Sequence, residues 1–255
     1  FAFFGIAGAL LAAWSLRLPE SLPQERRIPL AFRPLVAAGR FVVSSRFTMG
    51  LTLAQTAIFG FFASYLATTQ LIISDIYDLA EWFPLVFGGL ALAYGAATLF
   101  NARLIGRFGL RRVLRFATTG LVVASFAFAA SAVLTGGRPP LGVYLVGIGA
   151  ILLMHAWSSP NLNSAAMIPM GRVAGTAAAV IGAASTLGGA AIGASIDARY
   201  DGTITPMAIS AVLVGLVAYG LTRWSDAVWE RDAGRESISP QEQAEAVATA
   251  PTELG

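Results

Sequence analysis

The chain has 255 residues, of which 56% are hydrophobic and only 12% are charged, and its formal net charge is +3. A soluble domain carries about a quarter charged residues, so this composition excludes an ordinary soluble fold. The chain contains no cysteine, which excludes disulfides, thiolate metal sites and cysteine nucleophiles.

The apolar residues gather in blocks of about twenty, the length that crosses roughly 30 Å of hydrocarbon as an α-helix. Every backbone polar group must be satisfied within lipid, so such blocks form helices rather than open strands. We therefore predict an all-α membrane protein with six complete transmembrane helices, preceded by the end of another helix.

Two segments precede the complete blocks. Residues 1–16 are apolar, but no basic leader precedes them and no A-x-A cleavage site follows, which is not typical of a signal peptide. We expect the end of a transmembrane helix here, and a chain that is part of a longer protein. Residues 17–45 hold four prolines and five arginines, which predicts a cytoplasmic linker. Its second half, Leu35–Val43, is expected to lie as an amphipathic segment on the membrane surface.

The predicted bundle, residues 46–223, has short connections, as expected of antiparallel neighbours. Its blocks are Phe47–Ile73, Trp82–Leu104, Val113–Leu134, Leu141–Ala166, Val173–Ile196 and Ile204–Thr222. The last segment, residues 224–255, is rich in Glu, Ala, Ser and Pro and has no apolar face. We expect it to be a disordered cytoplasmic tail.

The arginines predict the orientation. All seventeen basic residues are arginine, and only Arg138 and Arg199 fall on one side of the predicted bundle. Because short cytoplasmic loops are rich in basic residues, the side with the other fifteen, which includes the C-terminus, is expected to be cytoplasmic. The same rule explains the basic balance without a nucleic-acid partner.

The connection at residues 101–114, NARLIGRFGLRRVL, resembles the signature loop of the major facilitator superfamily, as repeated between its eighth and ninth helices. The aligned residues are Arg107, Gly109, Arg111 and Arg112. The chain departs from the pattern at Gly106, where the first-half copy carries Asp, so the charge relay attributed to that Asp cannot operate here. Residues 18–22, LPESL, are similar to the end of the sixth helix, so the resemblance implies the second half of a twelve-helix transporter.

Residues 160–177, PNLNSAAMIPMGRVAGTA, and the Gly- and Ala-rich helix after them are similar to helices ten and eleven of Bcr/CflA-type drug exporters. The resemblance implies a multi-pass protein of the bacterial inner membrane that exports small amphipathic, drug-like molecules against protons. It implies an N-terminal six-helix half as partner, and no cofactor or metal. Two alternatives stay open: a uniporter or importer of a sugar-like or metabolite solute, and a non-transporting receptor or scaffold.

The glycines of the fifth block predict a close helix contact. Gly182, Gly188, Gly189 and Gly193 fall within Val173–Ile196. In lipid, small residues let two helices approach closely and gain packing. A static packing face and a contact that slides during transport both fit this pattern.

The fourth block carries His155 close to its centre. Since an imidazole titrates at about pH 6.5 in water, His155 is a candidate for substrate or proton handling. It can equally stay neutral and hydrogen-bond a nearby carbonyl. Trp157, Pro160 and Asn161 follow as a polar stretch, and interrupted helices near the midplane often mark binding sites. Alternatively, Pro160 only bends the helix.

The first block adds Gln55, Phe59 and Phe62 on one helical face, with Tyr65 nearby, and the second block adds Tyr94. A glutamine facing lipid would be unsatisfied, so these residues favour a cavity over a lipid-facing aromatic stripe. We predict that they line a substrate site together with the fourth block. One histidine, no cysteine and no G-x-x-x-x-G-K-[ST] phosphate loop indicate that the protein is not an enzyme.

Overall fold

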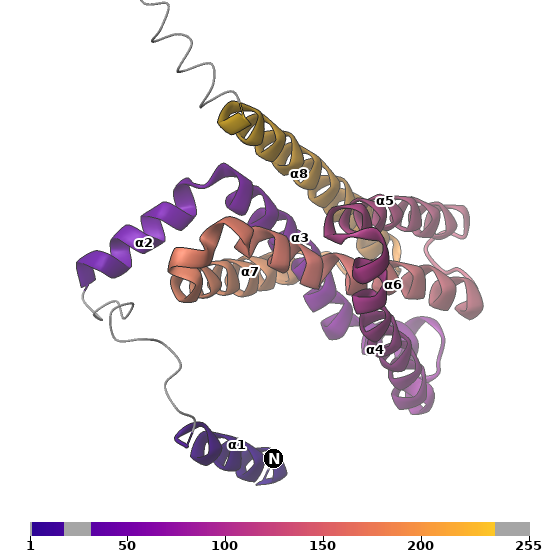
Figure 1. Cartoon of the computed structure of the whole chain (residues 1–255). Coiled ribbons are helices and arrows are strands. Elements are labelled where there is room, and N and C mark those ends of the chain that lie inside the picture. Colours follow the sequence, from indigo (N-terminus) through magenta and orange to yellow (C-terminus); the bar gives the residue numbers. More distant parts are fainter. Residues whose placement is uncertain (1, 18–31, 238–255) are drawn as a thin grey trace, which may run out of the picture. The chain divides into compact units, whose positions relative to one another are not determined.

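The computed structural model describes residues 2–17 and 32–237, and the elements in these stretches are helices. The long ones are α3 (Arg46–Leu71), α4 (Phe83–Phe108), α5 (Leu110–Leu134), α6 (Leu141–Met167), α7 (Ala174–Asp197) and α8 (Thr205–Ser237) (Figure 1). A π-helical turn, Ile72–Ile76, extends α3, and 3-10 turns at Ala80–Trp82 and Ile168–Val173 precede α4 and α7. All six helices are long and apolar enough to cross a membrane. The predicted all-α membrane fold is confirmed.

The chain divides into residues 1–37 and residues 38–255, and the six long helices belong to the second unit. Helix α1 (Ala2–Ser15) covers most of the predicted helix end, and helix α2 (Phe32–Ser44) covers the predicted amphipathic segment. Their places in or on a membrane stay predictions. Residues 18–31 of the predicted linker lie outside the described residues.

Local chemistry sets several helix ends. The Ser45 hydroxyl accepts a hydrogen bond from the backbone N–H of Thr48 at 3.3 Å and so caps the start of α3. Gly109 alone joins α4 to α5, at a φ of 82° that an L side chain rarely adopts. At the other end of the bundle, the carbonyl of Gly137 accepts a hydrogen bond from the Ile204 N–H at 3.0 Å. Gly109 thus connects α4 and α5 with one residue, and the Gly137–Ile204 bond joins the connection after α5 to the start of α8.

Four helices form the centre of the bundle. Helix α3 packs against α6 and α8, and α5 packs against the same two helices. The outer helices are α4, which packs mainly on α6, and α7, which packs mainly on α3. The core between the four central helices includes Leu51, Ile58, Phe128, Ile148 and Ile151. In contrast, α4 buries only Ala97 and Asn101 among the described residues and exposes a row of leucines, as a surface in hydrocarbon requires.

The prediction that disorder begins at Trp224 is wrong for residues 224–237, because α8 continues to Ser237. Arg115 of α5 donates to Asp226 at 2.7 Å and to Glu230 at 3.2 Å, and these two carboxylates lie one helical turn apart. The Trp229 ring packs 4.8 Å from the ring of Phe47. This extension is therefore held against α5 and α3, while residues 238–255 lie outside the described residues.

Replacing Arg115 by Gln should loosen the extension of α8 without unfolding the bundle. Arg115 is 40% exposed, so the two ion pairs contribute less than about 1 kcal/mol to global stability. Hydrogen exchange of residues 226–237 should accelerate several-fold, whereas Arg231→Gln on the same helix should leave it unchanged. Equal exchange in both variants would show that Arg115 does not hold α8.

Candidate substrate-binding site

Helix α6 makes side-chain hydrogen bonds to both α3 and α4. Towards α3, the amide nitrogen of Gln55 donates to the Ser159 hydroxyl at 2.8 Å. Towards α4, the Tyr94 hydroxyl lies 3.1 Å from Nδ1 of His155. One and a half turns further along α6, the amide of Asn161 is also paired with α4. Helix α6 therefore hydrogen-bonds polar side chains of both α3 and α4.

Asn161 and Asn101 exchange two hydrogen bonds. Each amide nitrogen donates to the other's oxygen, at 3.0 and 3.1 Å, and both side chains are buried. The sequence analysis singled out Asn161 but not Asn101, because nothing in a single sequence says which helices are neighbours. Each amide uses a donor and its oxygen to bond the other, so α4 positions the side chain of Asn161.

An aromatic cluster surrounds the imidazole. It consists of Phe62, Tyr65, Phe87, Tyr94 and His155. The Phe62 ring stacks on the imidazole with centroids 4.7 Å apart and planes 17° apart, and it stacks on Tyr94 at 5.5 Å. Offset stacking of this kind adds about 0.5–1.5 kcal/mol per pair beyond simple burial. The cluster is a stack of aromatic rings that carries two hydroxyls and one imidazole, in which Tyr65 and His155 are buried and the other three side chains are half-buried.

Two predicted site residues lie apart from the aromatic cluster. Phe59 packs over Gly189 of α7, where an added Cβ would overlap its ring. Trp157 points towards α5, with its ring 6.1 Å from Phe116 and its indole N–H donating to the Ala97 carbonyl at 2.9 Å. Trp157 and Phe116 also line a separate apolar pocket of about 410 Å³. The structure thus brings together Phe62, Tyr65, Tyr94 and His155, but not these two. Gln55 contacts α6 at Ser159, about one turn beyond His155.

Pro160 does not interrupt α6, which runs without a break from Leu141 to Met167. Proline has no N–H, so the carbonyl of Ala156, four residues before it, lacks its usual helical donor. Ala156 lies one residue after His155, on the stretch of α6 that carries the polar contacts. Of the two interpretations of this proline, the continuous helix fits the one in which it only modifies the helix locally.

The glycines of α7 make the predicted close contact, and the partner is α3. A Cβ added at Gly193 would lie 3.1 Å from the Gly60 carbonyl and 3.1 Å from Cβ of Ala63. Gly188 and Gly189 also face α3, whereas Gly182 has nothing within 4 Å of an added Cβ. The Ser64 hydroxyl of α3 donates to the carboxylate of Asp197, the last residue of α7. Two backbones therefore touch here and are held by a polar contact at one end.

The predicted arginine motif lies at the short turn between α4 and α5. The Arg111 guanidinium stands 5.1 Å over the Trp229 ring of α8, and that of Arg107 stands 5.3 Å over Phe108. Arg112 lines the 410 Å³ pocket beside Trp157. Sequence analysis missed the role of Arg115, the next basic residue, in pairing with α8. The motif thus contacts the end of α8 rather than the aromatic cluster.

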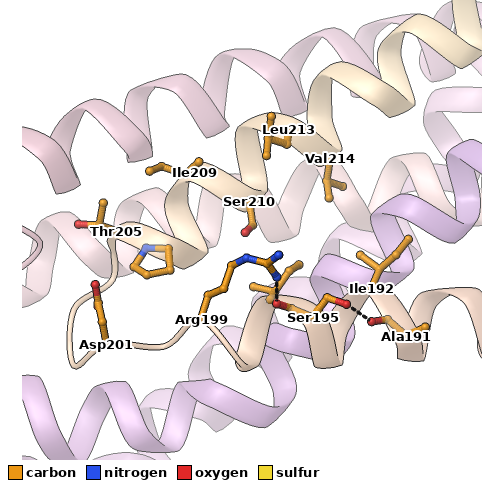
Figure 2. Close-up of a pocket in the computed structure, with 12 residues that line it drawn as sticks. Ala191, Ile192, Ser195, Arg199, Asp201, Thr205, Ile209, Ser210, Leu213 and Val214 are labelled. Atoms are coloured by element: carbon orange, nitrogen blue, oxygen red, sulfur yellow. Dashed lines mark hydrogen bonds between the residues drawn. The ribbon is translucent and has the colours of Figure 1, made fainter.

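A groove of about 740 Å³ lies between α7 and α8, at the end of the bundle opposite the arginine motif. The side chain of Arg199 reaches into it and donates to the carbonyl of Ser195 (Figure 2). Apolar side chains of α8, among them Ile209 and Leu213, form the facing wall. None of the predicted site residues lines this groove, so it is separate from the aromatic cluster.

The six long apolar helices indicate a multi-pass membrane protein. A comparison with known proteins finds a similarity to a transporter of the major facilitator (MFS) type. The chain is 29% identical over 217 residues, 82% of its length, to an uncharacterised MFS-type transporter, YdgK, of Bacillus subtilis strain 168. The chain spans about half, 52%, of that relative. No family model matches the chain, and no solved structure matches it. The similarity favours a transporter over an enzyme.

Proposed function

We propose that the chain is the second half of a proton-coupled exporter of the Bcr/CflA type, which expels small amphipathic, drug-like molecules across the bacterial inner membrane. The observation that carries the proposal is the aromatic cluster around His155, built from three helices of a six-helix bundle. Stacked rings bind flat apolar groups, and Gln55 with the tyrosine hydroxyls supplies a few polar contacts for orientation.

The packing of the bundle supports alternating access. Helix α4 is tied to α6 by the Asn101–Asn161 pair and by Tyr94, and α7 is tied to α3 by the glycine contact. Each outer helix is therefore held to a central helix by direct contacts. An N-terminal six-helix half would complete the cavity, and rocking of the two halves would expose the aromatic cluster to each side of the membrane in turn.

Transport by the full-length protein in inverted membrane vesicles tests the export and its coupling. A fluorescent amphipathic drug should accumulate when the vesicle interior is acidic, and a protonophore should abolish the accumulation. Flux that ignores the pH gradient would refute the coupling and would favour a uniporter.

In the same vesicles, His155→Leu and Gln55→Leu should each lower the initial rate at least about tenfold, because each removes a buried polar contact of the site. Gln70→Leu, an exposed position on the same helix, should keep the rate of the parent. Full transport by the first two variants would show that neither side chain belongs to the substrate site, whereas absence of transport by the parent itself would favour a receptor or scaffold.

Cysteine labelling tests the proposed orientation, with the arginine motif and the C-terminus in the cytoplasm. The chain has no cysteine of its own, so an introduced thiol reports without background from this half. A membrane-impermeant maleimide should label Thr135→Cys, at the exposed turn after α5, in intact cells. It should label Arg107→Cys only after permeabilisation. The opposite labelling pattern would show that the arginine motif faces outwards. It would contradict the proposed orientation and therefore the proposed direction of transport.

A further inference from the structure

A small cavity lies behind the imidazole, where the four central helices meet. Its volume is about 10 Å³, close to the least that holds one water molecule. Its lining residues are Ile58 and Phe61 of α3, Leu121 and Ser125 of α5, Ile151 and His155 of α6, and Ala211 and Val214 of α8. Six of these eight side chains are apolar, and the cavity contains no part of the aromatic cluster except His155.

Each of the two polar side chains of the cavity has one atom without a well-formed hydrogen bond in the described part of the chain, although the Ile58 backbone lies close to the imidazole. They are His155, through Nε2, and Ser125, through its hydroxyl. His155 is 3% exposed and Ser125 is fully buried. In folded proteins the large majority of buried polar atoms are paired, and ordered water supplies the partner where protein groups do not. Two unpaired groups facing one cavity therefore indicate a shared occupant.

We infer that this cavity holds one ordered water molecule that bridges Nε2 of His155 and the Ser125 hydroxyl. A drug-like solute is far too large for the volume. A cation would meet no carboxylate, because the remaining walls are hydrocarbon, and an ion without such partners is expelled from an apolar site. A water molecule needs two to four polar partners, and the cavity offers two side chains.

The water explains how the imidazole is held at the back of the site. Tyr94 lies against Nδ1, and we assign the tautomer in which the Tyr94 hydroxyl donates to Nδ1 and Nε2–H donates to the water. The resulting chain of hydrogen bonds runs from α4 through α6 to α5 and fixes the plane on which Phe62 stacks. His155 thereby becomes a positioned, neutral side chain. The inference concerns this chain alone and holds whichever solute is transported.

A structure of the full-length protein, at a resolution that shows ordered water, tests the inference directly. We expect a density peak within hydrogen-bond distance of both Nε2 and the Ser125 hydroxyl. An empty cavity, with Nε2 donating instead to the Ile58 carbonyl on the same wall, would overturn it. Density for a metal ion at this position would also overturn it.

Thermal unfolding of two variants of the same shape, Ala211→Val and Ala211→Thr, gives a second test. The sign of the change in Tm shows whether the cavity contains water. Ala211→Val fills the cavity with hydrocarbon, displaces the water and leaves both polar groups unpaired, so Tm should fall by several degrees. Ala211→Thr has the same shape but carries a hydroxyl that can replace the water, so its Tm should exceed that of the valine variant. If the valine variant melts at or above the parent, the cavity is dry and the inference fails.

Discussion

Gly193→Leu should separate α7 from α3 and abolish most transport. The glycine faces backbone rather than flexible side chains, since an added Cβ would lie 3.1 Å from the Gly60 carbonyl and 3.3 Å from the Ser64 amide nitrogen. Backbone cannot yield by a rotamer change, so the helices must move apart. Overpacking of this kind costs about 1–3 kcal/mol, and we expect Tm to fall by several degrees with a transport rate at least about tenfold lower.

The matched control is Gly220→Leu on α8, because an added Cβ at Gly220 meets nothing within 4 Å. Both variants place the same side chain in a long apolar helix, so helix propensity and hydrophobicity change equally. Gly220→Leu should keep parental Tm and rate. If Gly193→Leu behaved like this control, the backbone contact between α3 and α7 would not exist in the membrane.

Gly193→Ala distinguishes the two interpretations of the contact. One methyl group needs a shift of only a few tenths of an ångström from Gly60 and Ala63, and alanine is the better helix former. If the contact is a static packing face, stability and transport should change together and only slightly. If α7 slides along α3 during the cycle, transport should fall while Tm stays constant. Measuring both Tm and the transport rate of Gly193→Ala therefore distinguishes a static contact from a sliding one.

The sequence predicted the helices well because membrane physics leaves few alternatives. An apolar block of the right length must become a helix, and every predicted block corresponds to one. The end of α8 was missed since its partner, Arg115, lies on another helix. The spacing of Asp226 and Glu230, four residues apart, is the signal for a helical acidic face that composition alone conceals.

The sequence named candidate site residues one by one, and their role in a site stays a prediction, but it did not indicate which of them lie together. Phe59 and Phe62 share a face of α3, yet one packs on α7 and the other on His155, because α3 has neighbours on several sides. Trp157 follows His155 by two residues, which is about 200° around a helix and places it on the opposite side. That separation was available from spacing alone. The pairing of Asn161 with Asn101 required knowledge of the helix neighbours.

Breaking the Asn101–Asn161 pair should destabilise the protein, because an amide that is buried without a partner costs free energy. Asn101→Leu leaves the Asn161 side chain, which is 1% exposed, without a partner inside the bundle. Asn161→Leu likewise leaves the buried side chain of Asn101 without its hydrogen-bond partner. Each single variant should lower stability by about 1–3 kcal/mol, and the double variant should be no less stable than either one, since it buries no unpaired amide.

A double-mutant cycle measures the coupling through thermal unfolding of the full-length protein. Interhelical hydrogen bonds in membranes contribute about 0.6 kcal/mol on average, and a reciprocal amide pair should reach at least about 1 kcal/mol. Additive effects would mean that the two amides do not bond. The cycle also reports on function, because α4 is held to α6 by this pair and by Tyr94. The double variant should fold stably yet transport more slowly than the parent, since α4 loses its amide pair with α6 and keeps only the polar contacts of Tyr94 and Trp157.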